Sequence, residues 1–212
     1  VPSLALGNVK ENMKRHLAMM REAKEKHVSI VTFPELSLTG YTCGDLFFQR
    51  RLLDDVTDAL LALKDEMPEG ILAVVGAPLE IEGALYNCAV VLHKGEIISA
   101  VPKTFLPNNG EFYEKRWFQS GDARRDASVA IPKLKTDVCR QAIFETEDGV
   151  RFGSELCEDL WAPLPPSTML SVEGAEIILN LSASNELLSK REYRQQLISQ
   201  QSARCQCGYV YV

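Results

Sequence analysis

The segment NVKENMKRHLAMMREAKEKHVSIVTFPE, residues 8–35, contains the two hydrophobic patterns on which the fold prediction rests. In its first part, apolar side chains recur among charged ones at steps of four, four and three, as on one face of an amphipathic helix: Val9, Met13, Leu17 and Met20. The β-branched run 28–33 then predicts a short strand, which Pro34 closes. A helix over residues 8–26 is thus followed by a strand.

The alternation of helical and apolar segments continues along the chain. Residues 46–67 predict a second helix, and the apolar run 71–75 predicts a buried strand. The other predicted elements are a hairpin of 85–92 with 97–101 around Lys94-Gly95, a hairpin of 142–144 with 150–152 around Asp148-Gly149, a strand at 177–181, a helix at 189–207 and a strand at 209–212. Helices that alternate with apolar strands indicate an α/β fold whose mixed sheets are covered by helices.

The composition is that of one ordinary globular domain. Because 46% of the 212 residues are hydrophobic, 25% are charged and no stretch resembles a linker, we expect a single domain over 1–212. The net charge of −6, with basic residues scattered among acidic ones, argues against a nucleic-acid partner. No apolar run approaches the roughly 18 residues of a membrane span, so no membrane association is expected.

The cysteines and the chain ends bear on location and completeness. Six cysteines show no C-x-x-C pair, and no signal-peptide pattern is present, so we expect free thiols in a reducing, cytoplasmic setting. The chain begins at Val1 without a methionine and stops at Val212 inside an alternating strand pattern. We therefore expect a fragment, truncated at both ends.

Three chemically capable residues follow predicted strands, where the ligand site of an open α/β sheet lies. Glu35 follows Val-Thr-Phe-Pro, Lys103 follows Ala-Val-Pro, and Cys157 follows Gly-Ser-Glu-Leu. Taken singly, each has an ordinary interpretation: Glu35 as a solvated or helix-capping carboxylate, Lys103 as a surface cation, and Cys157 as a small buried hydrophobe.

Together the three residues fit a nucleophilic mechanism. Cys157 must become a thiolate to attack, yet neighbouring carboxylates raise the pKa of a thiol. Three such carboxylates adjoin it in the sequence: Glu155, Glu158 and Asp159. Lys103 supplies a compensating positive charge and a partner for a tetrahedral oxyanion, while Glu35 serves as a general base.

Other kinds of site have weaker support. A Cys–His pair is the usual alternative, but the three histidines lie on or beside the first predicted helix or at a hairpin turn: His16, His27 and His93. The one close thiol pair, Cys205-Gln-Cys207, has no partners at ligand spacing, so we expect no metal site. Gly40 and Gly110 lack the context of a phosphate-binding loop and are interpreted as turn glycines.

Three segments resemble the nitrilase, or carbon–nitrogen hydrolase, superfamily: FPELSLTGY (33–41), PKTFLP (102–107) and ELCEDLW (155–161). Three more are similar to the glutaminase domain of glutamine-dependent NAD synthetases: GYTCGDLF (40–47), LPNNGEFYEKRWF (106–118) and NLSASN (180–185). The resemblance implies a nitrilase-like four-layer α-β-β-α sandwich with mixed sheets. It also implies a cysteine that attacks the side-chain amide of L-glutamine, giving a glutamyl thioester and ammonia, after which water releases glutamate.

The resemblance assigns roles to individual residues. Glu35 matches the general base of the family, Lys103 the cation that holds the oxyanion, and Cys157 the nucleophile. Glu111, eight residues after Lys103, matches the second glutamate that orients the lysine. The backbone N–H of Glu158 is implied as a second oxyanion donor, in the manner of a nucleophile elbow.

Recognition of glutamine requires partners for its α-ammonium and α-carboxylate as well as for its amide. By resemblance, Glu158 takes the ammonium, Trp161 faces the bound amino acid, and Ser184 with Lys190 suits the carboxylate. Two alternatives stay open: Trp161 could be an aromatic residue of the core, and Ser184 could cap the end of a strand. Relatives commonly have tyrosine where this chain has Asn109, so an aromatic wall of the pocket is missing or replaced.

The resemblance also implies partners. The ammonia passes to a synthetase domain on the same, longer chain, so ATP and Mg belong to that absent domain and the glutaminase step uses no cofactor. A homo-oligomer is expected, because many sandwiches of this superfamily pair. Two other functions stay open: a free-standing amidase for another small amide or carbamoyl compound, and a non-catalytic docking module.

Overall fold

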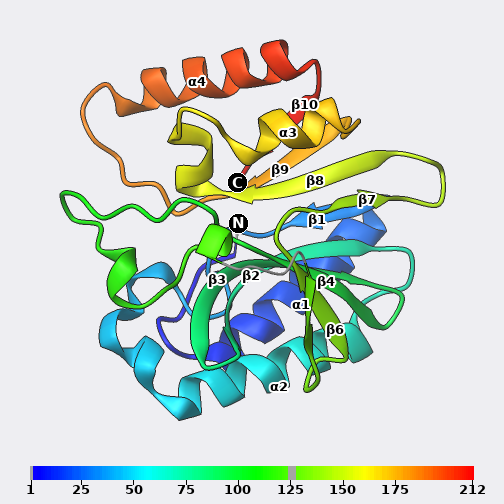
Figure 1. Ribbon diagram of the computed structural model, residues 1–212. Helices are drawn as coiled ribbons and strands as arrows, with labels where there is room; N and C mark the ends of the chain where they lie inside the picture. The colour runs from blue at the N-terminus through cyan, green and yellow to red at the C-terminus, as the bar shows by residue number, and fades with distance from the viewer. Residues whose placement is uncertain (1, 124–127) are drawn as a thin grey trace.

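The computed structural model describes residues 2–123 and 128–212. Two sheets face each other, and each carries helices on its outer side (Figure 1). Helices α1 (Val9–Glu25) and α2 (Arg50–Glu66) cover the first sheet, and α3 (Pro166–Val172) and α4 (Lys190–Cys205) cover the second. The expected α-β-β-α sandwich with mixed sheets is confirmed.

The first sheet has the strand order β1-β2-β3-β4-β6-β5. Strands β2, β3 and β4 form an antiparallel meander, whereas β1 pairs in parallel with β2 and β6 pairs in parallel with β4. Strand β5 is antiparallel to β6. The strands are β1 (Ile30–Thr32), β2 (Leu72–Ile81), β3 (Ala84–His93), β4 (Glu96–Pro102), β5 (Ser128–Ile131) and β6 (Thr136–Cys139).

The second sheet has the order β10-β9-β8-β7 and is parallel except for β7. Its strands are β7 (Ile143–Glu145), β8 (Arg151–Leu156), β9 (Ile177–Leu181) and β10 (Gly208–Tyr211). Because β8, β9 and β10 run in the same direction, their carboxyl ends meet at one edge of the sheet. Four short 3-10 helices complete the described elements: η1 (Tyr41–Phe48), η2 (Glu114–Arg116), η3 (Gly121–Ala123) and η4 (Cys157–Trp161).

Alternate residues of β2 contribute to two different cores. Ala73 and Val75 belong to the core under α1 and α2, while Val74 packs with Phe152 and Leu179 of the second sheet. The strand is apolar on both faces because it is buried on both faces, which explains its continuous hydrophobic sequence. A third, smaller core lies between the second sheet and its helices, with Leu170 and Ile178.

Several predicted boundaries were wrong. The predicted helix 46–67 is η1 followed by α2, because Gln49 between them has an extended backbone. The predicted strand 71–75 continues to Ile81, because every residue of β2 pairs with β3. Strand β8 runs on to Leu156, which places Cys157 directly at its carboxyl end. The β5–β6 hairpin and α3 were not predicted, since both are short and interrupted by polar residues.

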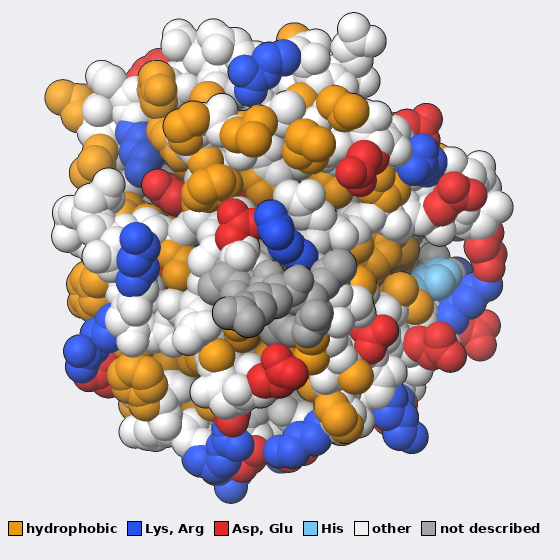
Figure 2. All heavy atoms as spheres, in the orientation of Figure 1, with side chains coloured by type: hydrophobic (Ala, Val, Ile, Leu, Met, Phe, Trp, Pro, Cys, Tyr) orange, Lys and Arg blue, Asp and Glu red, His pale blue; other side chains and the backbone are white. Residues whose placement is uncertain are grey.

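Two expectations from the sequence concern nucleic acid and the membrane, neither of which was expected as a partner. On the face drawn in Figure 2, basic and acidic side chains are interspersed, and no basic stripe crosses it. Within the described ranges, no helix is both long and apolar enough to cross a membrane.

Candidate active site

Glu35 lies in the turn that follows β1, and its side chain is 1% exposed. Its Oε1 accepts hydrogen bonds from Nδ2 of Asn87 at 2.8 Å and from Nζ of Lys103 at 2.6 Å. Its Oε2 accepts from the backbone N–H of Ala183 at 3.1 Å. Both carboxylate oxygens are therefore held by donors from three other parts of the chain.

The Glu35 turn packs directly on β2 at Gly76. A Cβ atom at position 76 would lie 2.3 Å from the carbonyl oxygen of Pro34 and 2.4 Å from the nitrogen of Leu36. No side chain fits at those distances, because both contacts are with backbone. The glycine therefore lets the turn sit close to the sheet and fixes where the Glu35 carboxylate lies.

Lys103 follows β4 and is fully buried. Its N–H donates to the carbonyl oxygen of Asn87 at 2.8 Å, and its Nζ lies 2.6 Å from Glu35 and 2.7 Å from Oε1 of Glu114. Burial opposes the charge of this ammonium, but the two carboxylates outweigh that effect, so the pKa of Lys103 is raised above its ordinary value. A buried cation results.

The carboxylate expected from Glu111 is supplied by Glu114 instead. Glu111 is exposed and accepts a hydrogen bond from Nδ2 of Asn185, so the expected contact with Lys103 was wrong. Glu114 begins the turn η2, where its side chain points inward and accepts from the Tyr41 hydroxyl at 2.6 Å. Burial and the nearby Glu35 raise the pKa of Glu114, and Lys103 lowers it. Its Oε2 is buried without a hydrogen-bond partner among the described residues.

Cys157 forms the turn between β8 and η4. Its backbone is left-handed, with φ 42°, which is strained for a residue with a side chain and is common at active sites. The side chain is 7% exposed. The pKa of the thiol is raised to about 12, mainly by burial and also by Glu35, while Lys103 acts in the opposite direction.

From the sequence, the rise in the thiol pKa was attributed to Glu155, Glu158 and Asp159, whereas burial and Glu35 are its main causes; the lowering effect of Lys103 is as expected. The adjacent Glu155 and Asp159 are both buried and hydrogen-bonded to backbone N–H groups. Asp159 accepts from the N–H of Leu156 at 2.9 Å, Thr104 at 3.1 Å and Phe105 at 2.7 Å. This carboxylate thus ties the Cys157 turn to the segment that follows Lys103.

Glu158, Trp161 and Lys190 lie together at the rim of the site. Nζ of Lys190 is 5.1 Å from the ring centre of Trp161 and 5.8 Å from that of Phe112, within cation–π range. It also donates to Oδ1 of Asn185. Glu158 is half-buried, and burial raises its pKa while Lys103 and Lys190 lower it.

The remaining two predicted residues lie further out. Oγ of Ser184 accepts from Nη1 of Arg194 at 3.3 Å, a cation that the sequence reasoning missed. Asn109 is exposed, and its carbonyl oxygen accepts from the N–H of Phe112 at 2.9 Å. That turn brings an aromatic ring to Lys190, although position 109 itself carries no aromatic side chain.

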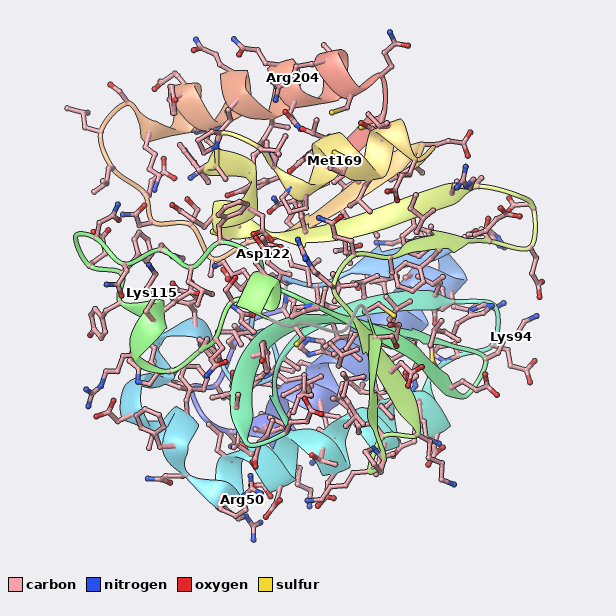
Figure 3. All side chains as sticks on the ribbon, viewed as in Figure 1. Arg50, Lys94, Lys115, Asp122, Met169 and Arg204 are labelled. Carbon is pink, nitrogen blue, oxygen red and sulfur yellow. The ribbon has the colours of Figure 1, made fainter. Side chains whose placement is uncertain are left out.

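A hollow of about 450 Å³ opens beside the rim. Glu158 and Trp161 line it, as do Thr104, Lys115 and Asp122, the last two of which are labelled in Figure 3. Thr104 is the next residue after Lys103, and Glu158 is the next after Cys157. The hollow is thus lined by the sequence neighbours of Lys103 and Cys157 and not by those two residues themselves.

No histidine joins the thiol. His16 is a buried residue of α1, where its ring bonds the Asn12 carbonyl oxygen and Oγ of Ser37, and burial lowers its pKa to about 4. His27 is exposed, and His93 bonds the carbonyl oxygen of Ile71. In residues 2–123 and 128–212 there is also no group of three His, Cys, Asp or Glu side chains that could hold a metal ion. The chemistry of the site is that of a thiol, two carboxylates and an ammonium.

Comparisons with known proteins agree with this geometry. The chain is 37% identical over 209 residues to the glutamine-dependent NAD(+) synthetase of Mycobacterium tuberculosis, covering 97% of this chain and 31% of that protein. The fold matches the solved glutamine-dependent NAD(+) synthetase of Cytophaga hutchinsonii with a TM-score of 0.86 at 29% identity, covering 100% of this chain and 34% of that one. An amidase from Nesterenkonia sp. shares the fold, with a TM-score of 0.77 at 16% identity, over 99% of this chain and 73% of that one.

The chain spans about a third of the length of the curated relatives it matches. Its sequence from residue 4 to residue 212 matches the family described as carbon–nitrogen hydrolase. The resemblance drawn from the motifs around Glu35, Lys103 and Cys157 is thereby confirmed. This chain belongs to the carbon–nitrogen hydrolase family.

Proposed function

We propose that this chain is a glutamine amidohydrolase domain that cleaves the side-chain amide of L-glutamine through a thioester on Cys157. The observation that carries the proposal is the buried ion pair of Glu35 and Lys103, at 2.6 Å, whose charges both act on the Cys157 thiol. Because the pKa of that thiol is raised to about 12, it is neutral at pH 7 and needs a base. Glu35 is the carboxylate placed to act as that base.

The first half-reaction forms the thioester. Glu35 takes the thiol proton as the sulfur attacks the amide carbon, and the carbonyl oxygen becomes an oxyanion. Lys103 and the backbone N–H of Glu158 hold that oxyanion, in the role of preorganised donors. Glu35 then gives its proton to the leaving nitrogen, the C–N bond breaks, and ammonia departs.

The second half-reaction releases glutamate. Glu35 takes a proton from water, the hydroxide attacks the thioester carbon, and the C–S bond breaks with the proton returned to sulfur. Glu114 supports both halves, since its carboxylate holds Nζ of Lys103 at 2.7 Å. Its partnerless Oε2 is an acceptor for an N–H or O–H of the reactants.

The rim residues suit the amino-acid part of glutamine. Glu158, half-buried beside the thiol, takes the α-ammonium, while Ser184 and Lys190 take the α-carboxylate. Trp161 and Phe112 flank Lys190 and serve as the aromatic walls. Phe112 thus replaces the aromatic group that Asn109 lacks.

We infer that the ammonia serves ATP-dependent NAD synthesis in a synthetase domain of the same protein. The support is that relatives named glutamine-dependent NAD(+) synthetases match this chain over only 31% and 28% of their own length. The proposed hydrolysis draws nucleophile, base and oxyanion partner from side chains, so it uses no cofactor. ATP and Mg would serve the synthetase step.

The test is intact-mass spectrometry after exposure to an electrophilic glutamine analogue. We expect one adduct, on Cys157, which an excess of L-glutamine blocks and which Cys157→Ala abolishes together with ammonia release. Cys88→Ala is the matched control, because Cys88 is also fully buried but lies in the middle of the first sheet. Undiminished ammonia release by Cys157→Ala would refute the proposal.

A substrate panel separates glutaminase from a general amidase. L-glutamine is compared with glutaramate, which lacks the α-amino group, and with 4-aminobutanamide, which lacks the α-carboxylate. We expect kcat/KM to fall at least about 100-fold for each, since each leaves a charged partner unpaired. Equal turnover of all three would favour an amidase for another small amide. A folded protein that turns over none of them and carries no adduct would favour a docking module.

We also infer self-association. Exposed apolar side chains gather on α3 and just before it, where Leu164 is 59%, Met169 42% and Val172 76% exposed, and Figure 2 shows hydrophobic side chains over this upper part of the molecule. Met169 is labelled in Figure 3. A second copy that packs on these residues would cover them. Light scattering of the wild type and of Val172→Lys measures the association, and an unchanged mass would refute this interface.

A further inference from the structure

We propose that Asn180 is a positioning residue for the Cys157 nucleophile, acting through the backbone N–H of Cys157. This inference rests on the proposed thioester chemistry and extends it to a side chain on β9 that faces α3 and α4 rather than the reactants. The N–H of Cys157 donates to Oδ1 of Asn180 at 3.1 Å, and both residues are buried.

The backbone at Cys157 needs such a partner. The parallel ladder of β8 and β9 ends where Leu156 is opposite Leu181, so the next N–H, that of Cys157, has no strand partner. The left-handed conformation at φ 42° then turns the chain into η4. A side-chain acceptor on the neighbouring strand holds that N–H, and the direction of the Cys157 side chain follows from it.

The same bond affects the oxyanion site. Because the N–H of Cys157 is engaged by Asn180, it points away from the reacting carbonyl. The next N–H, that of Glu158, is then the one available to stand beside Lys103. Asn180 thus selects which backbone donor serves the oxyanion.

The orientation of the Asn180 amide is itself fixed by a buried carboxylate. Nδ2 of Asn180 donates to Oε1 of Glu155 at 3.3 Å and to the Tyr209 hydroxyl at 2.9 Å, and Tyr209 also donates to Oε1 of Glu155. Oε2 of Glu155 accepts from the N–H of Ser167 at 2.7 Å. The N–H of Cys157 can only donate, so the carbonyl oxygen of Asn180 must face it, and the NH₂ then faces Glu155, whose two oxygens accept in these bonds.

This network joins the three parallel strands of the second sheet to the two helices that cover it. Glu155 is on β8, Asn180 on β9, Tyr209 on β10 and Ser167 on α3. Oγ of Ser167 in turn accepts from Nε2 of Gln201 on α4 at 2.9 Å. The position of the nucleophile is therefore set by the packing of α3 and α4 on the sheet.

The network can be tested by exchanging the amide of residue 180 with the carboxylate of residue 155. In Asn180→Asp, a second carboxylate faces Glu155, so the acceptor toward Cys157 is displaced or protonated. In the double variant Asn180→Asp/Glu155→Gln, the new amide donates to the new carboxylate. The Ser167 N–H then meets the glutamine oxygen, and an aspartate oxygen still faces Cys157. The network then keeps its hydrogen-bonded contacts, with the two bonds of Tyr209 reversed in direction and the carboxylate moved from position 155 to position 180.

The experiment measures kcat and KM for L-glutamine in the full chain, well below the unfolding temperature. We expect Asn180→Asp to lower kcat at least tenfold with KM within threefold of wild type, and the double variant to regain most of that loss. Tyr209→Phe, which keeps Asn180 and Glu155, should lower kcat two- to fivefold. Ser154→Ala, also buried on β8 but outside the network, is the matched control and should leave kcat within twofold.

A second readout does not depend on glutamine. Alkylation of Cys157 by iodoacetamide, followed by intact mass, should slow at least fivefold in Asn180→Asp and recover in the double variant. A folded Asn180→Asp with unchanged kcat and alkylation, or a double variant as poor as the single one, would overturn the proposal. If wild type does not hydrolyse glutamine, the proposed function fails, while the alkylation comparison still decides the role of Asn180.

Discussion

Replacing Gly76 by alanine should move Glu35, the proposed general base, without substituting any charged residue. The new Cβ would lie 2.3 Å from the Pro34 carbonyl oxygen and 2.4 Å from the Leu36 nitrogen, whereas ordinary contact begins at 3.4 Å. Relief of that overlap requires the turn that carries Glu35 to move by about 1 Å, because the opposing atoms are backbone and cannot rotate away.

A displacement of about 1 Å at a reacting group costs roughly 100-fold in rate. It would also lengthen the 2.6 Å contact between Glu35 and Lys103. We therefore expect kcat for L-glutamine to fall about 100-fold in Gly76→Ala, with KM changed little, since the rim residues do not touch this turn. The overpacking itself should lower the free energy of unfolding by about 1–3 kcal/mol.

A matched control separates displacement from simple destabilisation. Gly149 lies in the β7–β8 turn at φ 86°, where the methyl group of an alanine would meet nothing within 4 Å, so Gly149→Ala strains the backbone far from the site. The left-handed strain costs about 1–2 kcal/mol. Steady-state kinetics and urea unfolding of both variants check the prediction. A folded Gly76→Ala with kcat within threefold of wild type would show that the glycine does not set the position of Glu35.

Three further predictions concern charge. Lys103→Met leaves Glu35 and Glu114 buried without a cation, so the free energy of unfolding should fall by about 3–5 kcal/mol at pH 8. The loss should be smaller at pH 5, because burial raises the pKa of Glu114 and this carboxyl group is the first to take up a proton. Urea unfolding that shows the same loss at both pH values contradicts this. With its pKa at about 12, Cys157 should be alkylated by iodoacetamide about tenfold faster per pH unit between pH 7 and 10; a plateau below pH 9 contradicts it. Burial lowers the pKa of His16 from 6.5 to about 4, so as the pH falls the His16 ring takes up a proton in the unfolded chain before it does so in the folded one. The free energy of unfolding should therefore decrease between pH 6.5 and pH 4, by about 3 kcal/mol in all. His16→Gln should lack this component in urea unfolding, and an identical pH dependence of the two proteins would rule the effect out.

Hydrophobic periodicity predicted most of the fold because the central strands β2, β3, β8 and β9 bury nearly all of their apolar residues. Strand β9 was placed at its observed bounds, and Asn8 begins α1 as its N-cap, close to the predicted start. The splitting of the helix at Gln49 was not predictable in this way. An extended backbone at one polar residue leaves the apolar pattern on either side intact.

The candidate site was predicted where the residue itself follows a strand. Glu35, Lys103 and Cys157 do so, and the structure brings them together. The choice of Glu111 over Glu114 failed because spacing alone does not distinguish two glutamates three residues apart. The aromatic residues on both sides of Glu114 were a usable sign that it is the buried one.

For two other residues of the site, the sequence contains a sign of burial that the prediction did not use. Asn87 and Asn180 are single amides inside apolar strands, and a buried amide requires hydrogen-bond partners. Backbone contributions, such as the N–H of Ala183 on Glu35 and the left-handed Cys157, depend on how the two sheets dock. No local pattern in the sequence encodes them.

The hydrogen bond between Glu35 and Ala183 joins residues that are 148 positions apart, one beside each sheet. Contacts of such long sequence separation form late, after most of the loop-closure entropy has been lost. The reactive constellation therefore does not exist in a partly folded chain, even when each sheet is already formed. If the chain hydrolyses glutamine as proposed, we expect ammonia release to return during refolding only when the two sheets dock, so that it reports the last step of assembly rather than the first.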